Sequence, residues 1–310
     1  MEEQPSVNER IGLAACRRVG VSACRRAKWT GWTAWTAVVV CLRFAPRCPL
    51  SLLCPLRPLT RPTRRHALCL TPDPVCSRMK VLLFDTFGTL VDWRTSLITA
   101  LTDFGRDKGR QFSAAEIVDR WRAAYEPMMN RVRTGELPWT DLDALHRMAL
   151  TELLPDFQLS DLTAAEIDQL TLGWHHLSPW PDTVPGLTRL KRKFILAPLS
   201  NGNFSLLVDL AKFAGLPWDA IFGADLFKHY KPDPNTYLGA CQLLKTPPAD
   251  VMLVAAHNYD LKAAQSLGLK TAFVARPSEY GPRQTKDFGP EGAWDFVARD
   301  MNELAAMLGC

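Results

Sequence analysis

A four-residue apolar run at positions 81–84 ends in Asp85, and Phe87, Gly88 and Thr89 follow closely. A short, continuous apolar run is typical of a strand that is buried on both faces of a parallel sheet. An aspartate directly after such a strand lies at the rim where the carboxyl ends of the strands meet. Open α/β folds bind their ligands at this rim. The run therefore predicts an α/β fold with Asp85 at its functional edge.

Apolar runs and helical stretches alternate beyond Met79. We expect further strands at 194–199, 220–222, 251–255 and 271–274, with helices such as 204–214 and 261–267 between them. This alternation is typical of a parallel sheet with helical crossovers. Glycines stand where helices or turns should stop, at Gly215, Gly268 and Gly281. The sequence predicts a doubly wound, Rossmann-like parallel sheet.

Residues 94–180 contain no strand candidate and several helix signals. Capping boxes at 113–116 and 163–166 each predict the start of a helix, and the segment 140–143 predicts another. Pro127 should kink the first of these helices. Its apolar stripe has helical spacing and consists of Ile117, Trp121, Tyr125, Met128 and Val132. We expect a helical cap, inserted after the first strand, over the rim of the sheet.

The first 78 residues differ in composition from the rest. They hold 13 Lys and Arg against 4 Asp and Glu, whereas the remaining residues hold 24 against 28. The longest uncharged run, 29–42, is interrupted by threonines and is too short to span a bilayer. We expect a disordered extension that arises from a start site upstream of Met79; a transit peptide or a basic nucleic-acid arm are the alternatives.

The expected organisation is an extension at 1–78, an α/β core at 79–93 and 181–310, and a cap at 94–180. The acidic balance of the core and cap argues against a nucleic-acid partner, and no segment suits a membrane span. Only Cys241 and Cys310 lie beyond residue 78, so this part needs no disulfide framework. A cytoplasmic location is expected.

Four segments with polar residues follow the expected strands in order. They contain Asp85 with Thr89, Ser200 with Asn201, Lys231, and Asp260. This set, with the helical insertion after the first motif, is similar to the haloacid dehalogenase superfamily. The resemblance covers residues 79–310. It implies the capped α/β fold and a nucleophilic aspartate at position 85.

The absence of two carboxylates distinguishes between branches of that superfamily. The phosphatase pattern would place an acid at position 87 and a metal-binding aspartate at position 256, where this chain has Phe87 and Ala256. Phosphoryl transfer needs a metal and usually a proton donor for the leaving oxygen. Halide leaves without either. The chain therefore resembles the (S)-2-haloacid dehalogenase branch, which implies no cofactor and no metal.

The resemblance assigns catalytic roles to four residues. Asp85 would displace halide and form an aspartyl ester. Thr89 would orient Asp85, and Lys231 would keep it ionised. Asp260 would lie near the water that hydrolyses the ester. Each also has a purely structural reading, as a helix cap for Asp85, Thr89 and Asp260 or as a surface lysine for Lys231.

The resemblance also implies a set of substrate-binding residues. Arg122, which follows Trp121 of the buried stripe, would grip an anion or lie at the solvated edge of the helix, with Arg131 and Arg133 as rivals. His257 stands where the family often has asparagine, and it would donate a hydrogen bond, activate water or only fill space. The remaining members are Ser200 and Asn201, for which an ordinary turn is the alternative, Tyr237, for which a core position is the alternative, and Phe87, where the family often has tyrosine.

The sequence predicts a hydrolase that converts short 2-haloalkanoic acids and water to 2-hydroxyalkanoic acids and halide. Its partners would be the small-molecule substrate and a possible second copy of the chain in a homodimer. The alternatives are a Mg²⁺-dependent small-molecule phosphatase of the same superfamily and a non-catalytic protein that retains the fold.

Overall fold

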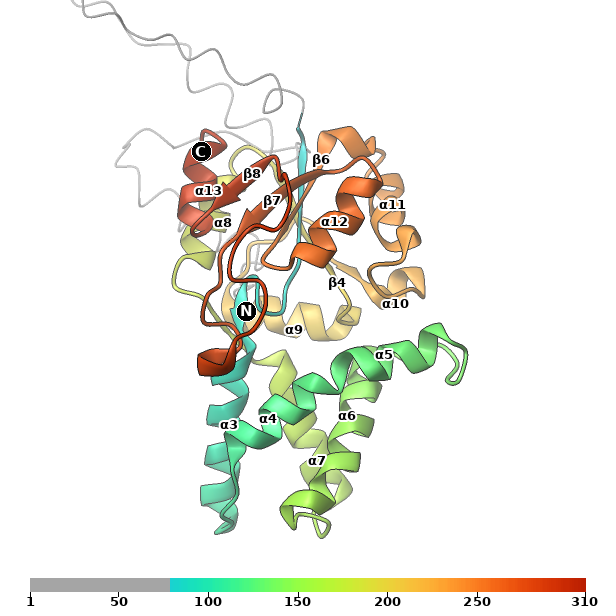
Figure 1. Ribbon diagram of the computed structural model, residues 1–310, viewed down its shortest axis with the longest axis vertical. Coiled ribbons are helices and arrows are strands. Elements are labelled where there is room, and N and C mark those ends of the chain that lie inside the picture. Colours follow the sequence, from blue (N-terminus) through green and yellow to red (C-terminus); the bar gives the residue numbers. More distant parts are fainter. Residues whose placement is uncertain (1–78) are drawn as a thin grey trace, which may run out of the picture. The chain divides into compact units, whose positions relative to one another are not determined.

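The computed structural model describes residues 79–310, so the expectations for residues 1–78 lie outside the described part. Its main sheet has six parallel strands in the order β5-β4-β1-β6-β7-β8. Figure 1 shows the sheet above a group of helices. The strands are β1 (Val81–Phe84), β4 (Ile195–Ser200), β5 (Phe222–Gly223), β6 (Val251–Ala255), β7 (Lys270–Val274) and β8 (Phe296–Ala298). The predicted doubly wound α/β fold is confirmed.

Strand β1 pairs with β4 on one edge and with β6 on the other, so it lies inside the sheet, and all four of its side chains are buried. Successive side chains of a strand point to opposite faces, and β1 follows this rule. Leu82 and Phe84 pack into one apolar cluster, and Val81 and Leu83 pack into the other. This central position brings the following residue, Asp85, out at the middle of the rim.

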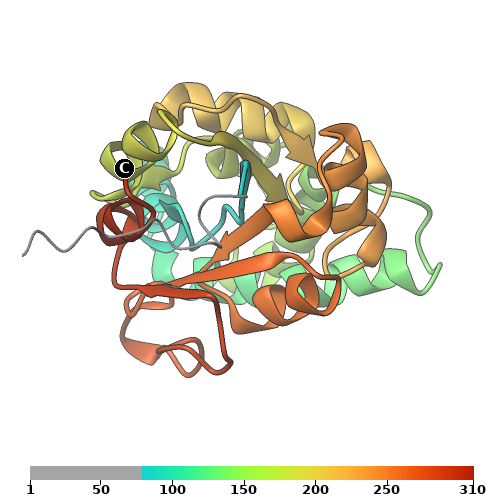
Figure 2. The ribbon, with the colours of Figure 1, turned by 90° about the horizontal axis from the view of Figure 1, so that it is seen from above.

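Helices cover both faces of the sheet, as Figure 2 shows from above. One face packs against α8 (Thr183–Leu190), α9 (Phe204–Ala214) and α13 (Met301–Met307). The other packs against α11 (Pro234–Leu243) and α12 (Asn258–Ser266), and the short helix α10 (Ala224–Phe227) precedes α11.

A helical insertion follows β1 and lies beyond the carboxyl ends of the strands (Figure 1). It is entered and left through an antiparallel pair, β2 (Val91–Asp92) and β3 (Ser178–Pro179). The expectation of no strand within 94–180 is therefore wrong at β3, whose two residues are too few for a recognisable apolar pattern. The α-helices of the insertion are α3 (Trp93–Lys108), α4 (Ala114–Ala123), α5 (Tyr125–Arg133), α6 (Leu142–Leu153) and α7 (Ala164–Thr171).

The helix starts agree with the sequence signals in two cases and differ in a third. Ser113 caps α4, and Thr163 forms a reciprocal capping box with Glu166 at the start of α7. The cap of α6 is Asp141, one residue after the expected Thr140, and its side chain accepts a hydrogen bond from the Ala144 N–H. Aspartate is a strong N-cap residue.

The predicted kink at Pro127 is instead a break between two helices at Ala124, where α4 ends and α5 begins. Pro127 lies in the first turn of α5, where the missing N–H would have had no partner within the helix. The buried stripe continues across the break, and Val132 is partly buried against it.

None of the helices within residues 79–310 combines the length and the apolar character that a bilayer-spanning segment requires.

Candidate active site

Asp85 follows β1 directly, and both of its carboxylate oxygens accept hydrogen bonds. Oδ1 accepts from Lys231 Nζ at 2.8 Å. Oδ2 accepts from Thr89 Oγ1 at 2.7 Å and lies 3.0 Å from His257 Nδ1. Burial acts to raise the pKa of Asp85, but the charges of Lys231 and His257 outweigh it and hold the pKa well below its usual range. Asp85 is therefore an ionised carboxylate in a buried setting.

Lys231 joins Asp85 to Asp260. Its side chain is 1% exposed, and Nζ also donates to Asp260 Oδ2. Burial acts to lower the pKa of Lys231, but the two carboxylates outweigh it and raise the pKa, so the ammonium stays charged. A lysine that is buried this deeply is not the surface residue that the sequence left open.

Asp260 lies in the first turn of α12 and is fully buried. Its Oδ1 accepts a hydrogen bond from Tyr237 Oη at 2.5 Å. Burial raises the pKa of Asp260, against the opposing charge of Lys231. A carboxylate with a raised pKa is a better proton acceptor than an ordinary one.

Thr89, Ser200 and Asn201 complete the polar rim. Thr89 Oγ1 accepts from the Ala256 N–H at 2.9 Å, which leaves its hydroxyl proton for Asp85. Asn201 Oδ1 accepts from the Lys231 N–H at 2.7 Å. Ser200 Oγ accepts from the Gly202 N–H at 3.1 Å, so its own proton is available to another acceptor.

His257 lies between two carboxylates. Its Nδ1 faces Asp85, and its Nε2 lies 3.0 Å from Glu279 Oε2. Burial acts to lower the pKa of His257, but Glu279 and Asp85 outweigh it and raise the pKa to about 10. Because carboxylates only accept hydrogen bonds, both ring nitrogens donate and the ring is an imidazolium.

Glu279 is a site residue that the sequence reasoning missed. It lies in the loop after β7, and it also accepts from Trp93 Nε1 at 3.1 Å. The sequence feature that could have identified Glu279 is its position in the loop after a predicted strand, which places it at the same rim as the four motifs. No motif of the resembled family marks this position.

Arg122, on α4, has donors that the protein does not use. Its guanidinium lies over the rings of Tyr125 and Trp93, with centroid distances of 4.2 and 5.4 Å. The Nε atom is buried and has no hydrogen-bond partner. Arg122 also lines a cavity of 360 Å³, together with Trp93 and Tyr280. A half-buried cation whose buried Nε–H has no partner is suited to bind an anionic ligand.

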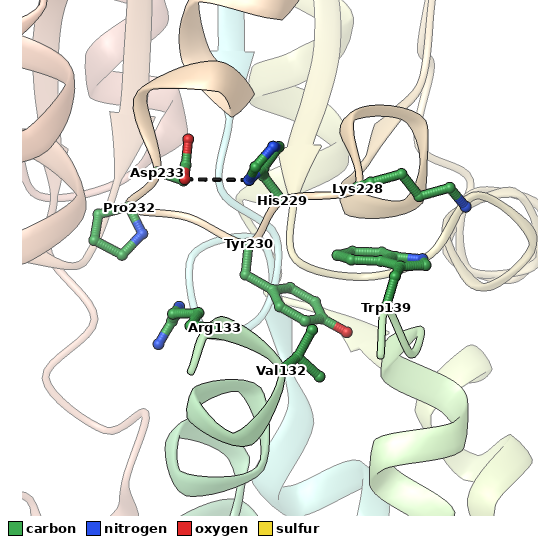
Figure 3. A pocket seen from close by; sticks show the side chains of 8 residues that line it. All are labelled: Val132, Arg133, Trp139, Lys228, His229, Tyr230, Pro232 and Asp233. Carbon is green, nitrogen blue, oxygen red and sulfur yellow. Dashed lines mark ion pairs between the residues drawn. The ribbon is translucent and has the colours of Figure 1, made fainter. Parts of the chain in front are cut away.

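The two rival arginines are already paired. Arg131 contacts Glu136 and Glu152 near the surface. Arg133 pairs with Glu126 and donates to the Lys231 carbonyl oxygen at 2.6 Å. It lines a second cavity, of 490 Å³, which lies where α5 meets the segment before Lys231 (Figure 3).

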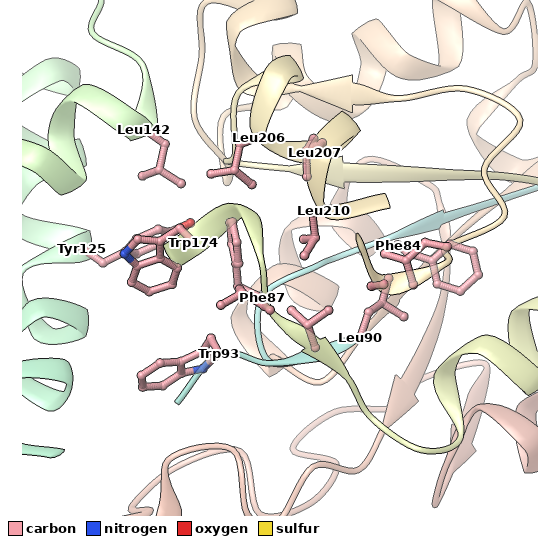
Figure 4. Close-up of a cluster of buried hydrophobic side chains, with 14 of the residues drawn as sticks. Phe84, Phe87, Leu90, Trp93, Tyr125, Leu142, Trp174, Leu206, Leu207 and Leu210 are labelled. Atoms are coloured by element: carbon pink, nitrogen blue, oxygen red, sulfur yellow. The ribbon is translucent and has the colours of Figure 1, made fainter. Parts of the chain in front are cut away.

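Aromatic rings form the apolar wall of the site. Phe87 meets Trp174 edge-on at 5.6 Å, and Trp174 stacks on Trp93 at 6.3 Å and on His146 at 4.1 Å. Figure 4 shows Phe87, Trp93, Tyr125 and Trp174 in this arrangement. Burial lowers the pKa of His146 to about 3, so this histidine is neutral. The wall lowers the local dielectric and strengthens the charges next to it.

A magnesium ion does not fit the donor set around Asp85. Residues 87 and 256 offer a phenyl ring and a methyl group in place of oxygen ligands. Both Asp85 oxygens already accept from Lys231 or His257, and these cations would repel a divalent ion. Within the described part of the chain, no cluster of three or more His, Cys, Asp and Glu has a metal-binding arrangement.

The fold thus gathers the residues singled out from the sequence at one rim. Hydrogen bonds link a polar network of Asp85, Thr89, Asn201, Lys231, Tyr237, His257 and Asp260. Ser200 lies beside it at the end of β4, Phe87 belongs to the wall, and Arg122 comes from the helical insertion. Their catalytic and binding roles stay predictions.

Comparison with known proteins places this arrangement in a family. The family model of haloacid dehalogenase-like hydrolases matches residues 79–268. The (S)-2-haloacid dehalogenase 1 of Pseudomonas sp. (strain CBS-3) is 32% identical, over 67% of this chain and 89% of that protein.

Two crystal structures are more similar still. The L-2-haloacid dehalogenase PA0810 is 54% identical with a TM-score of 0.73, over 74% of this chain and 98% of the other. The defluorinating L-2-haloacid dehalogenase Rha0230 is 48% identical with a TM-score of 0.74, over 76% and 98%. The chain therefore belongs to the haloacid dehalogenase-like hydrolases.

Proposed function

We propose that this protein is a hydrolytic (S)-2-haloacid dehalogenase that acts on short 2-haloalkanoic acids. The observation that carries the proposal is the ionised, buried carboxylate of Asp85, which is held by Lys231, while Phe87 and Ala256 stand where a phosphatase would have its acid and its metal ligand. The relatives that are named (S)- or L-2-haloacid dehalogenases support the same activity and configuration.

In the first half-reaction, Asp85 attacks the α-carbon of the substrate. The bond from the carboxylate oxygen to carbon forms as the carbon–halogen bond breaks, and the halide leaves with the bonding electron pair. The substrate carboxylate would bind Ser200, Asn201 and backbone N–H groups at the rim. The unpartnered Nε–H of Arg122 would stabilise the negative charge that develops on the departing halide.

In the second half-reaction, water attacks the carbonyl carbon of the aspartyl ester. Asp260, next to Lys231, would accept the proton of this water. Cleavage of the bond between the carbonyl carbon and the ester oxygen releases the 2-hydroxy acid and regenerates the Asp85 carboxylate. The net reaction consumes one water and releases one halide and one proton, and it needs no cofactor.

The runner-up activity is a magnesium-dependent phosphatase. Phe87 and Ala256 argue against it because a phosphate ester needs charge neutralisation and a proton for the leaving oxygen. The non-catalytic alternative is disfavoured by the shared hydrogen bonds of Asp85, Lys231 and Asp260, since a site that had lost its function would not need to keep a buried charge network.

Halide release tests this proposal. Chloro-, bromo- and fluoroacetate and both enantiomers of 2-chloropropionate are incubated with the protein in excess EDTA. We expect release from the haloacetates and the (S)-enantiomer, undiminished by EDTA and abolished in Asp85→Asn. Phosphate-monoester hydrolysis that requires Mg²⁺, without halide release, would contradict the proposal, and so would full activity of the variant.

We also propose a cytoplasmic protein that acts on a small molecule and on neither nucleic acid nor membranes. The scarcity of cysteine beyond residue 78 and the acidic balance there support this. A homodimer is the expected assembly from the resemblance alone, and light scattering of the purified chain distinguishes it from a monomer.

A further inference from the structure

The two oxygens of Asp85 differ in their hydrogen bonding. Oδ2 faces two donors, Thr89 Oγ1 and His257 Nδ1, whereas Oδ1 faces one, Lys231 Nζ. A carboxylate oxygen has two lone pairs in the carboxylate plane. Oδ2 therefore has none to spare, and Oδ1 has one with which to attack carbon. After the attack, Oδ1 is the ester oxygen and Oδ2 is the carbonyl oxygen.

Negative charge then develops on Oδ2 when water attacks the ester. The new bond joins the water oxygen to the carbonyl carbon, and the electron pair of the C=O double bond moves onto Oδ2. Collapse restores this double bond and breaks the bond to Oδ1, and the departing alkoxide takes up the proton that the water lost. Thr89 and His257 already point at the atom where this charge appears. Fixed donors of this kind are among the largest contributions to catalysis.

We propose that Thr89 and His257 form the oxyanion hole of ester hydrolysis, and that Glu279 is a positioning residue that keeps His257 protonated in the ester intermediate. This inference rests on the proposed dehalogenase function. It assigns a role to a loop residue that the four motifs do not include.

Glu279 is needed because alkylation removes the other carboxylate that His257 contacts. The ester of Asp85 carries no charge, so Glu279 is then the carboxylate that offsets the cost of burying a cation. The other groups near the pair are the Tyr259 ring, 5.8 Å from the imidazole, the Arg122 cation and the Tyr280 hydroxyl near Glu279, and the Trp93 N–H. None of them supplies a negative charge at neutral pH.

The nucleophile loop is shaped around the Glu279 carboxylate. Gly88 lies between Phe87 and Thr89 with a φ of +85°, and a Cβ atom at this position would lie 2.1 Å from Glu279 Oε1. Trp93 Nε1 holds the same oxygen. The carboxylate, the imidazolium and the loop that carries Asp85 therefore form one packed unit.

The test is the Glu279→Gln variant of the full chain, with rapid quenching and intact-mass measurement during turnover of (S)-2-chloropropionate. Glutamine keeps the shape and removes the charge. We expect the first halide release to change less than about threefold, and ester hydrolysis to slow about 10- to 100-fold, because one oxyanion donor is weakened. The alkylated enzyme should accumulate, and kcat and KM should fall together. Glu303→Gln, which removes a carboxylate paired with exposed Arg299, is the matched control.

A pH profile separates this role from a structural one. The wild-type rate of ester hydrolysis should stay level from about pH 6 to about pH 9, while that of Glu279→Gln should fall as the imidazolium loses its proton. The Glu279→Asp variant, which keeps the carboxylate, should hydrolyse the ester faster than Glu279→Gln. Equal slowing of both half-reactions, with no alkylated enzyme and no change in the pH profile, would overturn the proposal.

A double-mutant cycle covers the case in which Glu279→Gln folds poorly. Glu279 acts through His257, so His257→Gln/Glu279→Gln should hydrolyse the ester within about threefold of His257→Gln alone. If the losses in the rate of ester hydrolysis of the two single variants multiply in the double variant, the proposal is contradicted. If the wild type releases no halide, the proposed dehalogenase function has failed. If the wild type releases halide but the Glu279 variants do not accumulate the ester, only the role of Glu279 has failed.

Discussion

At the scale of single residues, the site depends on a balance of buried charges. Asp85, Asp260 and Glu279 are offset by Lys231 and His257, and all five side chains are largely removed from water. Burying any of these charges alone is costly, and partners of opposite charge reduce that cost. Removal of one member should therefore affect both stability and activity.

Lys231→Met tests this balance. It leaves Asp85 and Asp260 without their shared cation, and we expect a loss of about 3–5 kcal/mol in the free energy of unfolding. Dehalogenation should be abolished. Urea denaturation measures the first effect and halide release the second. Lys270→Met, which removes a more exposed lysine paired with Asp295, should change stability by less than about 1 kcal/mol. Equal effects of the two variants would contradict the account.

The residues of the site were predictable where they follow a strand. Asp85, Asn201, Lys231 and Asp260 stand after apolar runs, and the fold brings the ends of these runs together. Glu279 also follows a strand, but it was not singled out, since its role depends on tertiary contacts with His257, Trp93 and Gly88 that the sequence does not show. Arg122 could be singled out but not distinguished from its rivals, because only the structure shows which arginines have partners.

At the scale of elements, one histidine ties the helical insertion to the core. His175 lies 3.1 Å from Asp143 on α6 and 2.8 Å from Asp209 on α9. Burial acts to lower the pKa of His175, but hydrogen bonds to the two aspartates outweigh it and raise the pKa. The stabilisation is therefore complete below the unfolded-state pKa of about 6.5 and is lost as the pH rises through the folded-state value.

His175→Gln should accordingly lower the Tm more in acid than in base. We expect a loss of about 2–4 °C at about pH 5.5, from about 1 kcal/mol, and a smaller loss at about pH 8.5. Differential scanning fluorimetry at both pH values measures the loss of Tm. His176→Gln, at the exposed neighbouring histidine, is the control. A larger loss at the higher pH would contradict the sign of the pKa shift.

Close packing of α8 against α13 makes a second prediction at this scale. A Cβ atom at Gly186 would lie 2.5 Å from Met301 Cβ and 2.7 Å from its backbone carbon. Gly186→Ala should therefore cost about 1–3 kcal/mol of stability through overpacking. Gly289→Ala, where no atom lies within 4 Å, should be nearly neutral. Chemical denaturation of both variants measures the contrast, and a neutral Gly186→Ala would show that the interface can relax.

Long elements could be predicted from the sequence and short ones could not. Strands β1, β4, β6 and β7 appear within a residue of their expected bounds, because each is a continuous apolar run. Strand β8 was missed and β5 was misplaced. Strand β8 has three residues and β5 has two, which is too few for a recognisable apolar pattern. Position in the sheet determines those strands, through pairing with β7 and β4.

At the scale of the whole molecule, the residues proposed for the reaction all lie within 79–310. The family match begins at residue 79 as well. A chain that starts at Met79 should therefore keep the kcat and KM of the full chain within about twofold, since it contains every residue proposed for the site. Steady-state halide release from the two chains tests this, and loss of activity in the shorter chain would assign a role to residues 1–78.

The covalent role of Asp85 is the central claim, and isotope labelling tests it most directly. Excess enzyme converts (S)-2-chloropropionate in a single turnover in ¹⁸O-water, and the lactate and the peptide that contains Asp85 are analysed by mass spectrometry. The account predicts unlabelled lactate and one ¹⁸O atom in Asp85, because water attacks the aspartyl carbonyl carbon. Labelled lactate with an unlabelled Asp85 would contradict it.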